Sequence, residues 1–322
     1  MADPIIVGID CGATKVMVQT TFFDRKLNRV TPGNTHFEYS YSDHSNWNEN
    51  FLPVNLDIQR SEYSDGNISL TEAELNQGCI IIETIRKAIS DTDTDSAGLC
   101  FPGIKDDKGV VIMANGPRIP DLVERIEGIE SLFNDSDCCV LGEWRSTVGK
   151  MQDCKNAVYI GGGTGIADGI ILNNEIVDIK THSEAKRSWE MIMPNGESVE
   201  QCLSLGSMLN QWNGGEEKSI NAILALFDQA LSGDVFAKNI IEKASKAFLF
   251  LIAKRTEFFH RHNARPEKIV IGQRLGKILS DKSNPLSKLI FQNNYYDTSI
   301  EISTDRSTAA LGAAYKAYDQ QK

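Results

Sequence analysis

Two glycine-rich turns, each between two apolar runs, constrain the fold of this chain more than any other feature. The first turn covers residues 10–15 (DCGATK) and lies between the runs 5–10 and 16–23. The second turn covers residues 161–165 (GGGTG), within the apolar stretch 157–172. Apolar runs on both sides of a short glycine turn predict a β-hairpin. A Walker or Rossmann glycine motif leads from a strand into a helix, so neither motif is expected here.

The repetition of this unit predicts a duplicated architecture. The chain has 322 residues, of which 41% are hydrophobic, and this is enough for two lobes of ordinary size. We therefore expect an α/β fold of two lobes with a cleft between them. The first lobe is expected to span residues 1–141 and the second 142–306, with a C-terminal helix at about 307–322 packing back onto the first lobe.

The spacing of apolar residues places further elements between the turns. Thr71 and Glu74 form a capping-box pattern at the start of a helix expected over 70–90. Other helices are expected at 121–133, 200–212, 220–231, 240–252 and 309–318, and other strands at 97–101, 110–113, 138–141, 176–179 and 268–271. Residues 31–66 are polar and rich in aromatic side chains, which predicts an edge strand and a long loop, either a functional lid or a decorative insertion.

Both turns have the composition of a phosphate-binding backbone, because small residues leave backbone N–H groups bare. In the second turn, four glycines in five residues are costly to order on folding, so a close approach by a ligand is the expected reason for them. Asp10 is placed to hold Mg²⁺ directly or through water. The candidate nucleotide-binding residues are Asp10, Gly12, Ala13, Thr14 and Lys15 in the first turn and Gly162, Gly163, Thr164 and Gly165 in the second.

The composition excludes several classes of protein. The net charge of −11 and a sequence pI of about 5.0 argue against nucleic-acid binding, which needs clustered Lys and Arg. The first residues lack the pattern of a signal peptide, and no run of 18 apolar residues predicts a membrane span, so a cytoplasmic protein is expected. The seven cysteines include no C-x-x-C pair and are expected to be free thiols, not disulfides or zinc ligands.

On these motifs the chain resembles the ROK group of sugar kinases, within the hexokinase/actin/Hsp70 superfamily. The resemblance extends over nearly the whole chain, and its other anchors are the segments 101–104 (FPGI), 115–117 (NGP), 199–204 (VEQCLS), 269–272 (IVIG) and 310–314 (ALGAA). It implies a two-lobed, ribonuclease H-like ATPase fold of the actin/hexokinase type. It also implies ATP and Mg²⁺ as cofactors, a sugar hydroxyl as acceptor and a homodimer. No DNA-binding helix-turn-helix precedes Ile5, as expected for the kinase branch of the group.

In the resembling kinases an Asp after a buried strand takes the proton of the sugar hydroxyl that attacks the γ-phosphate. That Asp belongs to an Asn-Asp pair. In the group this pair follows the strand that here ends at Leu141, but the residues that follow it in this chain are Gly142-Glu143-Trp144-Arg145. Glu143 is then the candidate catalytic base. The alternative is that Glu143 pairs with Arg145 and has no catalytic role.

The sugar-binding and zinc residues of the group are only partly matched. Residues 182–204 contain only His182 and Cys202 as candidate zinc ligands, so no zinc is expected. The resemblance implies that Glu200 holds sugar hydroxyls, and that Glu190 does so too unless it is an exposed charge beside a buried Trp. Asn115 and Gly116 stand where the group binds sugar, although Asn-Gly is also an ordinary turn pair.

The nucleotide side departs from the group at two positions. Where two glycines commonly follow the last apolar strand, this chain has Gly272 and Gln273, and Gln273 could either bond the nucleotide or narrow its pocket. Asp168 stands near the second turn, where it could serve Mg²⁺ or cap the hairpin.

Three functions are consistent with these observations. The first is an ATP-dependent sugar kinase that acts on a hexose or an N-acetylhexosamine. The second is a nucleotide- or sugar-binding sensor or scaffold of the same fold that has lost catalysis. The third is phosphorylation of a non-sugar hydroxyl, or use of another phosphate donor. The bare glycines favour nucleotide binding under the first two.

Overall fold

The structure is a computed structural model that describes residues 6–92, 94, 96–129, 131–179, 181–217, 219–292 and 298–321. Ile5 and Lys322, at the ends of two segments predicted from the sequence, lie outside the described residues. The chain divides into two compact units. Unit 1 contains the chain up to Gln152 together with the C-terminal segment from Ser307, and unit 2 is Asp153–Arg306.

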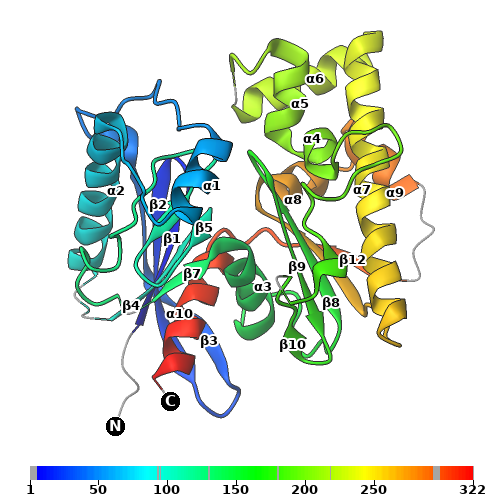
Figure 1. Cartoon of the computed structure of the whole chain (residues 1–322). Helices are drawn as coiled ribbons and strands as arrows, with labels where there is room; N and C mark the ends of the chain where they lie inside the picture. The colour runs from blue at the N-terminus through cyan, green and yellow to red at the C-terminus, as the bar shows by residue number, and fades with distance from the viewer. Residues whose placement is uncertain are drawn as a thin grey trace. The chain divides into compact units, whose positions relative to one another are not determined.

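Unit 1 is built on a five-stranded sheet in the order β3-β2-β1-β4-β7 (Figure 1). β1 pairs antiparallel with β2 and parallel with β4, and β7 continues the parallel part. Its strands are β1 (Ile6–Cys11), β2 (Lys15–Asp24), β3 (Arg29–Ser40), β4 (Ala97–Phe101), β5 (Ile104–Lys105), β6 (Val110–Ile112) and β7 (Leu132–Asn134). Its helices are η1 (Tyr41–Asp43), α1 (Leu56–Ser64), α2 (Glu72–Ser90), α3 (Asp135–Arg145) and α10 (Thr308–Gln320).

Unit 2 repeats this plan with the strand order β10-β9-β8-β11-β12. β8 pairs antiparallel with β9 and parallel with β11, as β1 does with β2 and β4. Its strands are β8 (Ala157–Gly162), β9 (Ile166–Leu172), β10 (Glu175–Ile176), β11 (Lys268–Gly272) and β12 (Ser299–Ile302). Its helices are η2 (Ser183–Ala185), α4 (Val199–Leu203), α5 (Leu205–Asn213), α6 (Ile220–Leu231), α7 (Val235–Arg261), α8 (Gln273–Ser280) and α9 (Pro285–Gln292). Both predicted hairpins and the duplicated strand–turn–strand unit are confirmed.

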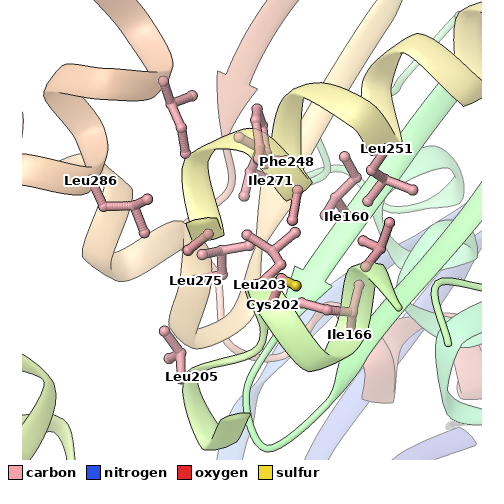
Figure 2. Close-up of a cluster of buried hydrophobic side chains, with 14 of the residues drawn as sticks. Ile160, Ile166, Cys202, Leu203, Leu205, Phe248, Leu251, Ile271, Leu275 and Leu286 are labelled. Carbon is pink, nitrogen blue, oxygen red and sulfur yellow. The ribbon is translucent and has the colours of Figure 1, made fainter. Parts of the chain in front are cut away.

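Each unit has its own apolar core. In unit 1, Val7, Ile9 and Leu99 of the sheet pack with Ile82 and Ile85 of α2. In unit 2 the core joins the sheet to α4, α7 and α8, and Figure 2 shows Ile160 and Ile271 of the strands beside Phe248, Leu251 and Leu275 of the helices. The capping box predicted for the helix at 70–90 is present, because Thr71 accepts a bond from the Glu74 backbone and Glu74 accepts one from the Thr71 backbone.

The C-terminal helix α10 lies directly on strands of unit 1, and glycines make this possible. A side chain at Gly8 of β1 would overlap the carbonyl oxygen of Ala310, and one at Gly98 of β4 would overlap that of Ala313. α10 also packs closely on α3, where Gly142 lies against Thr308. The backbone of α10 therefore touches the sheet with no side chain between them.

The sequence prediction for 121–145 was wrong in two places. The helix predicted at 121–133 is a series of turns that leads into β7, and the strand predicted at 138–141 is the middle of α3. Asn134 starts this helix by accepting bonds from the backbone of Ser136 at 3.0 Å and Asp137 at 3.3 Å. Because α3 continues to Arg145, the lobe boundary predicted at residue 142 falls inside a helix, and unit 1 extends to Gln152.

Three further elements differ from their prediction. The region 31–66 contains not only the predicted edge strand but also helix α1. The helix predicted at 200–212 is two helices, because Ser204 has an extended backbone and ends α4 where α5 begins. The strand predicted at 176–179 ends at Ile176.

Within the described part of the chain, no single helix is long and apolar enough to cross a membrane. α6 and α7 pass that test only as a pair, which is bent by 112° at its break.

Candidate active site

Three parallel strands of unit 1 end at the same edge of the sheet, and each is followed by polar groups. β1 ends with Asp10 and Cys11, β4 ends before the turn Pro102-Gly103, and β7 ends at Asn134, directly before Asp135. Asp10 faces Cys100 in the β1–β4 register, and Cys100 faces Phe133 in the β4–β7 register. We call Asp10, Asp135 and the adjacent Lys105 the acidic edge.

Both carboxyl groups of the acidic edge have raised pKa values, chiefly because they are buried. Burial and the neighbouring Asp135 raise the pKa of Asp10 to about 6, although the Cys100 thiol and Lys15 act in the opposite direction. Cys100 Sγ lies 3.6 Å from Asp10 Oδ1 and donates to it. Burial also raises the pKa of Asp135 above its ordinary value, against the lowering effect of Lys105. Carboxyl groups with raised pKa values at a strand end are the usual signature of general bases or metal ligands.

Lys105 is a cation held beside these acids. Its Nζ donates to the carbonyl oxygens of Phe101 and Gly103, both at 2.7 Å. Burial lowers the pKa of Lys105, while Asp135 has the opposite effect. The prediction from the sequence did not include Lys105 or Asp135. The Asn-Asp pair at 134–135 was the signal in the sequence that could have identified Asp135.

Glu143, the predicted base, does not lie at the acidic edge. It is eight residues beyond Asp135 in α3, which corresponds to about 12 Å along a helix. Its side chain is fully buried, and its Oε2 accepts a bond from the backbone of Lys150 at 2.8 Å. The prediction placed Glu143 after a strand that does not exist. The residue after the strand is Asp135, and we withdraw Glu143 as the candidate base.

The first glycine turn connects β1 with β2. The Gly12 backbone donates to Lys15 O at 2.9 Å, and the Tyr41 backbone donates to Thr14 O at 3.0 Å. Thr14 is exposed and Gly12 is half-buried. The Lys15 ammonium pairs with Glu38 at 2.5 Å, so this predicted nucleotide ligand is directed toward β3. Ala13 lies between them and is also half-buried.

The second glycine turn, in unit 2, is packed on one side and open on the other. A side chain at Gly162 would come within 2.7 Å of Leu275, and one at Gly165 within 2.9 Å of Glu200. A side chain at Gly163 would meet no atom within 4 Å. Packing therefore explains Gly162 and Gly165, whereas Gly163 faces open space, where only a ligand would need a bare backbone.

A small apolar recess adjoins the exposed side of this turn. Its walls come from the turn, α5, the start of α6 and α8, namely Gly163, Thr164, Leu205, Gly206, Leu209, Ser219, Ile220, Ile223 and Arg274. The Gly206 backbone, in the first turn of α5, donates to Gly163 O at 3.3 Å, so the helix begins beside the glycines. The recess measures only about 20 Å³, so the turn offers bare backbone to a phosphate group but no room for a base ring.

Gly272 and Gln273 lie at the same turn. Gly272 ends β11, and Gln273 begins α8 with a φ of +55°, a left-handed value that glycine adopts more readily. Gly161 lies against the Gln273 side chain, where an added Cβ would be 2.9 Å from Cδ. The replacement of glycine by Gln273 is therefore accommodated at the cost of a less favourable backbone conformation.

Glu200 is brought to the second glycine turn, and Glu190 is not. Glu200 Oε2 accepts a bond from the Ile166 backbone at 2.8 Å, and burial raises the pKa of Glu200. Glu190 is exposed and accepts a bond from the Arg187 backbone at 2.7 Å, within a local turn. The Trp189 beside it, expected to be buried, is 50% exposed.

Asp168 is not available to a metal. It is buried on β9 and forms an ion pair with Arg255 of α7, which also donates to Lys186 O at 2.8 Å. Asn115 is exposed and Gly116 is buried in the segment after β6.

A larger cavity of about 280 Å³ lies elsewhere in unit 2, between residues 184–192 and α7. Glu257 at this cavity is paired with both Lys254 and Arg261. Because Glu257 is already held by both cations, we assign the cavity no function.

Mg²⁺ fits the acidic edge by its chemistry. Among the described residues, no group of three or more His, Cys, Asp or Glu side chains could hold a metal by itself. Mg²⁺ does not need such a group, because it keeps several waters and is usually held by one or two carboxylates and the phosphates of the substrate. Asp10 supplies such a carboxylate at the edge of the sheet.

Comparisons with known proteins place the fold. No protein-family model matches the sequence, and none of the curated proteins is similar to it. Among solved structures, the chain is similar to a ROK family glucokinase from Streptomyces griseus in complex with glucose and AMPPNP. The TM-score is 0.60 at 15% identity, over 98% of this chain and 99% of that one.

Two other similar structures differ in what they do. An inorganic polyphosphate/ATP-glucomannokinase from Arthrobacter sp. strain KM has a TM-score of 0.57 at 16% identity, over 99% of this chain and 100% of that one. A ROK family transcriptional regulator, a homologue of the E. coli MLC protein, has a TM-score of 0.56 at 16% identity, over 98% of this chain and 78% of that one. The actin/hexokinase-type α/β fold expected from the sequence is confirmed, and this chain has the fold of the ROK kinases.

Proposed function

We propose that this chain is a ROK family sugar kinase that transfers the γ-phosphoryl group of Mg-ATP to a hydroxyl of a hexose or an N-acetylhexosamine. The observation that carries the proposal is the Asn134-Asp135 pair, in which Asn134 ends β7 and Asp135 follows it at the same sheet edge as Asp10. The Asn-Asp pair that the resemblance requires is thus found after a strand, in place of Glu143.

The proposed roles follow from the chemistry at the acidic edge. Asp135 accepts the proton of the attacking sugar hydroxyl while the oxygen forms a bond to the γ-phosphorus and the bond from that phosphorus to the ADP oxygen breaks. Burial raises the pKa of Asp135, which makes it a better proton acceptor once ionised. Asp10 would hold Mg²⁺, which supplies positive charge to the phosphates.

In unit 2, the phosphates of the nucleotide are assigned to the second glycine turn. Gly163 and the exposed Thr164 offer backbone to the phosphates. The glucokinase and the glucomannokinase that share this fold support ATP as the donor and a hexose as the acceptor.

One observation favours a second function, that of a nucleotide- or sugar-binding regulator. Gln273 occupies a left-handed position against the second glycine turn, where its side chain takes up room that a glycine would leave free. One of the structures with this fold is a transcriptional regulator.

A sugar panel separates the two functions. Formation of ADP from Mg-ATP is measured with glucose, mannose, N-acetylglucosamine and N-acetylmannosamine, and without sugar. A kinase forms ADP only with one or more of the sugars and forms the sugar phosphate in equal amount. Binding of ATP or sugar with no turnover on any of them would favour the regulator and contradict the proposal.

A further inference from the structure

A short exposed segment of unit 1, Ala114-Asn115, is held at both ends by buried polar side chains. Met113 precedes it, and Arg118 follows it after Gly116 and Pro117. Because these flanking residues are buried and hydrogen-bonded, the exposed residues between them have little freedom to move.

Gln59 of α1 holds the first end. Its Oε1 accepts a bond from Met113 N at 2.8 Å, and its Nε2 donates to Met113 O at 3.0 Å and to Val54 O at 2.6 Å. The side chain therefore pairs with both backbone groups of Met113, as a neighbouring strand would. Gln59 is fully buried, so removal of its amide would leave these backbone groups unpaired.

Arg118 holds the second end. It donates to both carboxylate oxygens of Glu74 at 2.7 and 2.9 Å, to Ser69 O at 3.0 Å, and to Glu62 of α1. Arg118 is 1% exposed. A buried ion pair contributes little net stability compared with well-packed apolar residues. We therefore interpret the pairing of Arg118 as a contact that fixes the geometry of the segment.

Met113, which precedes the held segment, lies beside the turn after β4. A side chain at Gly103, which follows β4, would be 3.1 Å from Met113 Sδ. The carbonyl oxygen of the same Gly103 accepts a bond from Lys105. Met113 therefore connects the held segment to the turn after β4, which Lys105 of the acidic edge also contacts.

We infer that Gln59, Glu62 and Arg118 form a clamp that fixes Ala114-Asn115 as an acceptor-binding segment, and that α1 serves sugar recognition in this chain. The inference rests on the proposed function, since it names the acceptor side of the same site. The clamp residues are positioning residues, because they act through the segment and not on the sugar. Two of them come from the 31–66 region, whose role the sequence left open.

The test compares Gln59→Leu with a matched control in unit 2. Asn284 is also buried and makes the same set of bonds, two donated to Ile278 O and Asp281 O and one accepted from Ser287 N. Asn284→Leu therefore imposes a similar structural loss away from the clamp. A milder variant, Glu62→Gln, keeps the shape of the side chain and removes its charge from Arg118.

Two measurements are made on each variant. Hydrogen exchange of the peptide that covers 113–119 should become faster in Gln59→Leu and Glu62→Gln and stay unchanged in Asn284→Leu. The KM for the best sugar of the panel should rise about tenfold in Gln59→Leu, with the KM for ATP unchanged, because two of the three lost bonds order the backbone of Met113 beside the acceptor segment. Glu62→Gln should show a smaller rise of the same kind.

Exchange that stays slow in Gln59→Leu would overturn the clamp. Faster exchange with an unchanged sugar KM would overturn the role of the segment in acceptor binding. If the wild-type protein phosphorylates no sugar, the proposed function fails separately. Calorimetric titration with glucose and N-acetylmannosamine then replaces KM, and weaker binding of either sugar by Gln59→Leu supports the clamp, while equal or absent binding contradicts it.

Discussion

The two units share one strand order but put different residues at the end of their first hairpin strand. The fifth residue of that strand is Asp10 in unit 1 and Gly161 in unit 2. Unit 1 adds Asp135 after β7, whereas the buried acid of unit 2, Asp168, is neutralised by Arg255. The same scaffold therefore provides carboxylates in one unit and bare backbone in the other.

The two units are therefore suited to different chemical roles. Carboxylates with raised pKa values suit proton transfer and metal binding, and an open glycine turn suits close contact with phosphate. Substitutions in unit 1 should therefore mainly change the chemical step, and substitutions at the turn of unit 2 should mainly change nucleotide affinity.

The largest effect is expected for Asp135→Asn. The amide cannot accept the hydroxyl proton, so kcat for the sugar should fall by about 10³-fold while ATP affinity stays within about twofold. Glu143→Gln is the matched control on the same helix and should keep kcat within about twofold, because Glu143 is bonded to the Lys150 backbone. Steady-state kinetics decide this, and the reverse pattern would restore Glu143 as the base.

Lys105→Met should have the next largest effect. Removal of the cation raises the pKa of Asp135, because Lys105 lowers it. The acidic limb of the pH profile of kcat/KM, where activity is lost as Asp135 becomes protonated, should move to higher pH, and kcat at pH 7 should fall by about 10- to 100-fold. Lys105→Arg keeps the charge and should keep the limb in place. A profile unchanged in Lys105→Met would show that Lys105 only braces the turn after β4.

Asp10→Asn should stabilise the fold, although Asp10 is assigned to the active site. The folded protein holds the pKa of Asp10 at about 6, above its ordinary 3.8, so ionisation of Asp10 costs folding free energy as pH rises through this window. At pH 7.5 and without Mg²⁺, Asp10→Asn should gain about 2 kcal/mol in the free energy of unfolding, and the gain should vanish below pH 3.8.

Urea unfolding at several pH values measures this gain. Asp228→Asn, at an exposed position on α6, is the control and should change stability little at any pH. A loss of stability in Asp10→Asn at pH 7.5 would mean that the carboxylate of Asp10 stabilises the fold, contrary to its assignment as a functional group.

Gly163→Ala gives the smallest expected effect and tests unit 2. No protein atom lies within 4 Å of the added methyl group, so the melting temperature should stay unchanged. The KM for ATP should rise about tenfold if the phosphates approach this backbone, and the sugar KM should not change. An unchanged ATP KM would mean that the second turn does not hold the nucleotide.

Local signals in the sequence determined part of the structure. Both hairpins and the start of α2 follow from turn residues and a capping box that act over a few positions, so they could be read without the fold. The glycines of the second turn were also informative without the fold. Ordering them costs conformational entropy, which packing or a bound ligand must offset.

Only the tertiary structure decided where the acids meet. The short apolar run Cys138–Leu141 fits a buried strand as well as a buried helix. It is a helix because Asn134 caps it and α10 covers it, a contact with residues far along the chain. That choice moved the strand end from Leu141 to Asn134 and replaced Glu143 by Asp135. Asp10, Lys105 and Asp135 lie far apart in the sequence, and parallel pairing of β1, β4 and β7 brings them to one edge.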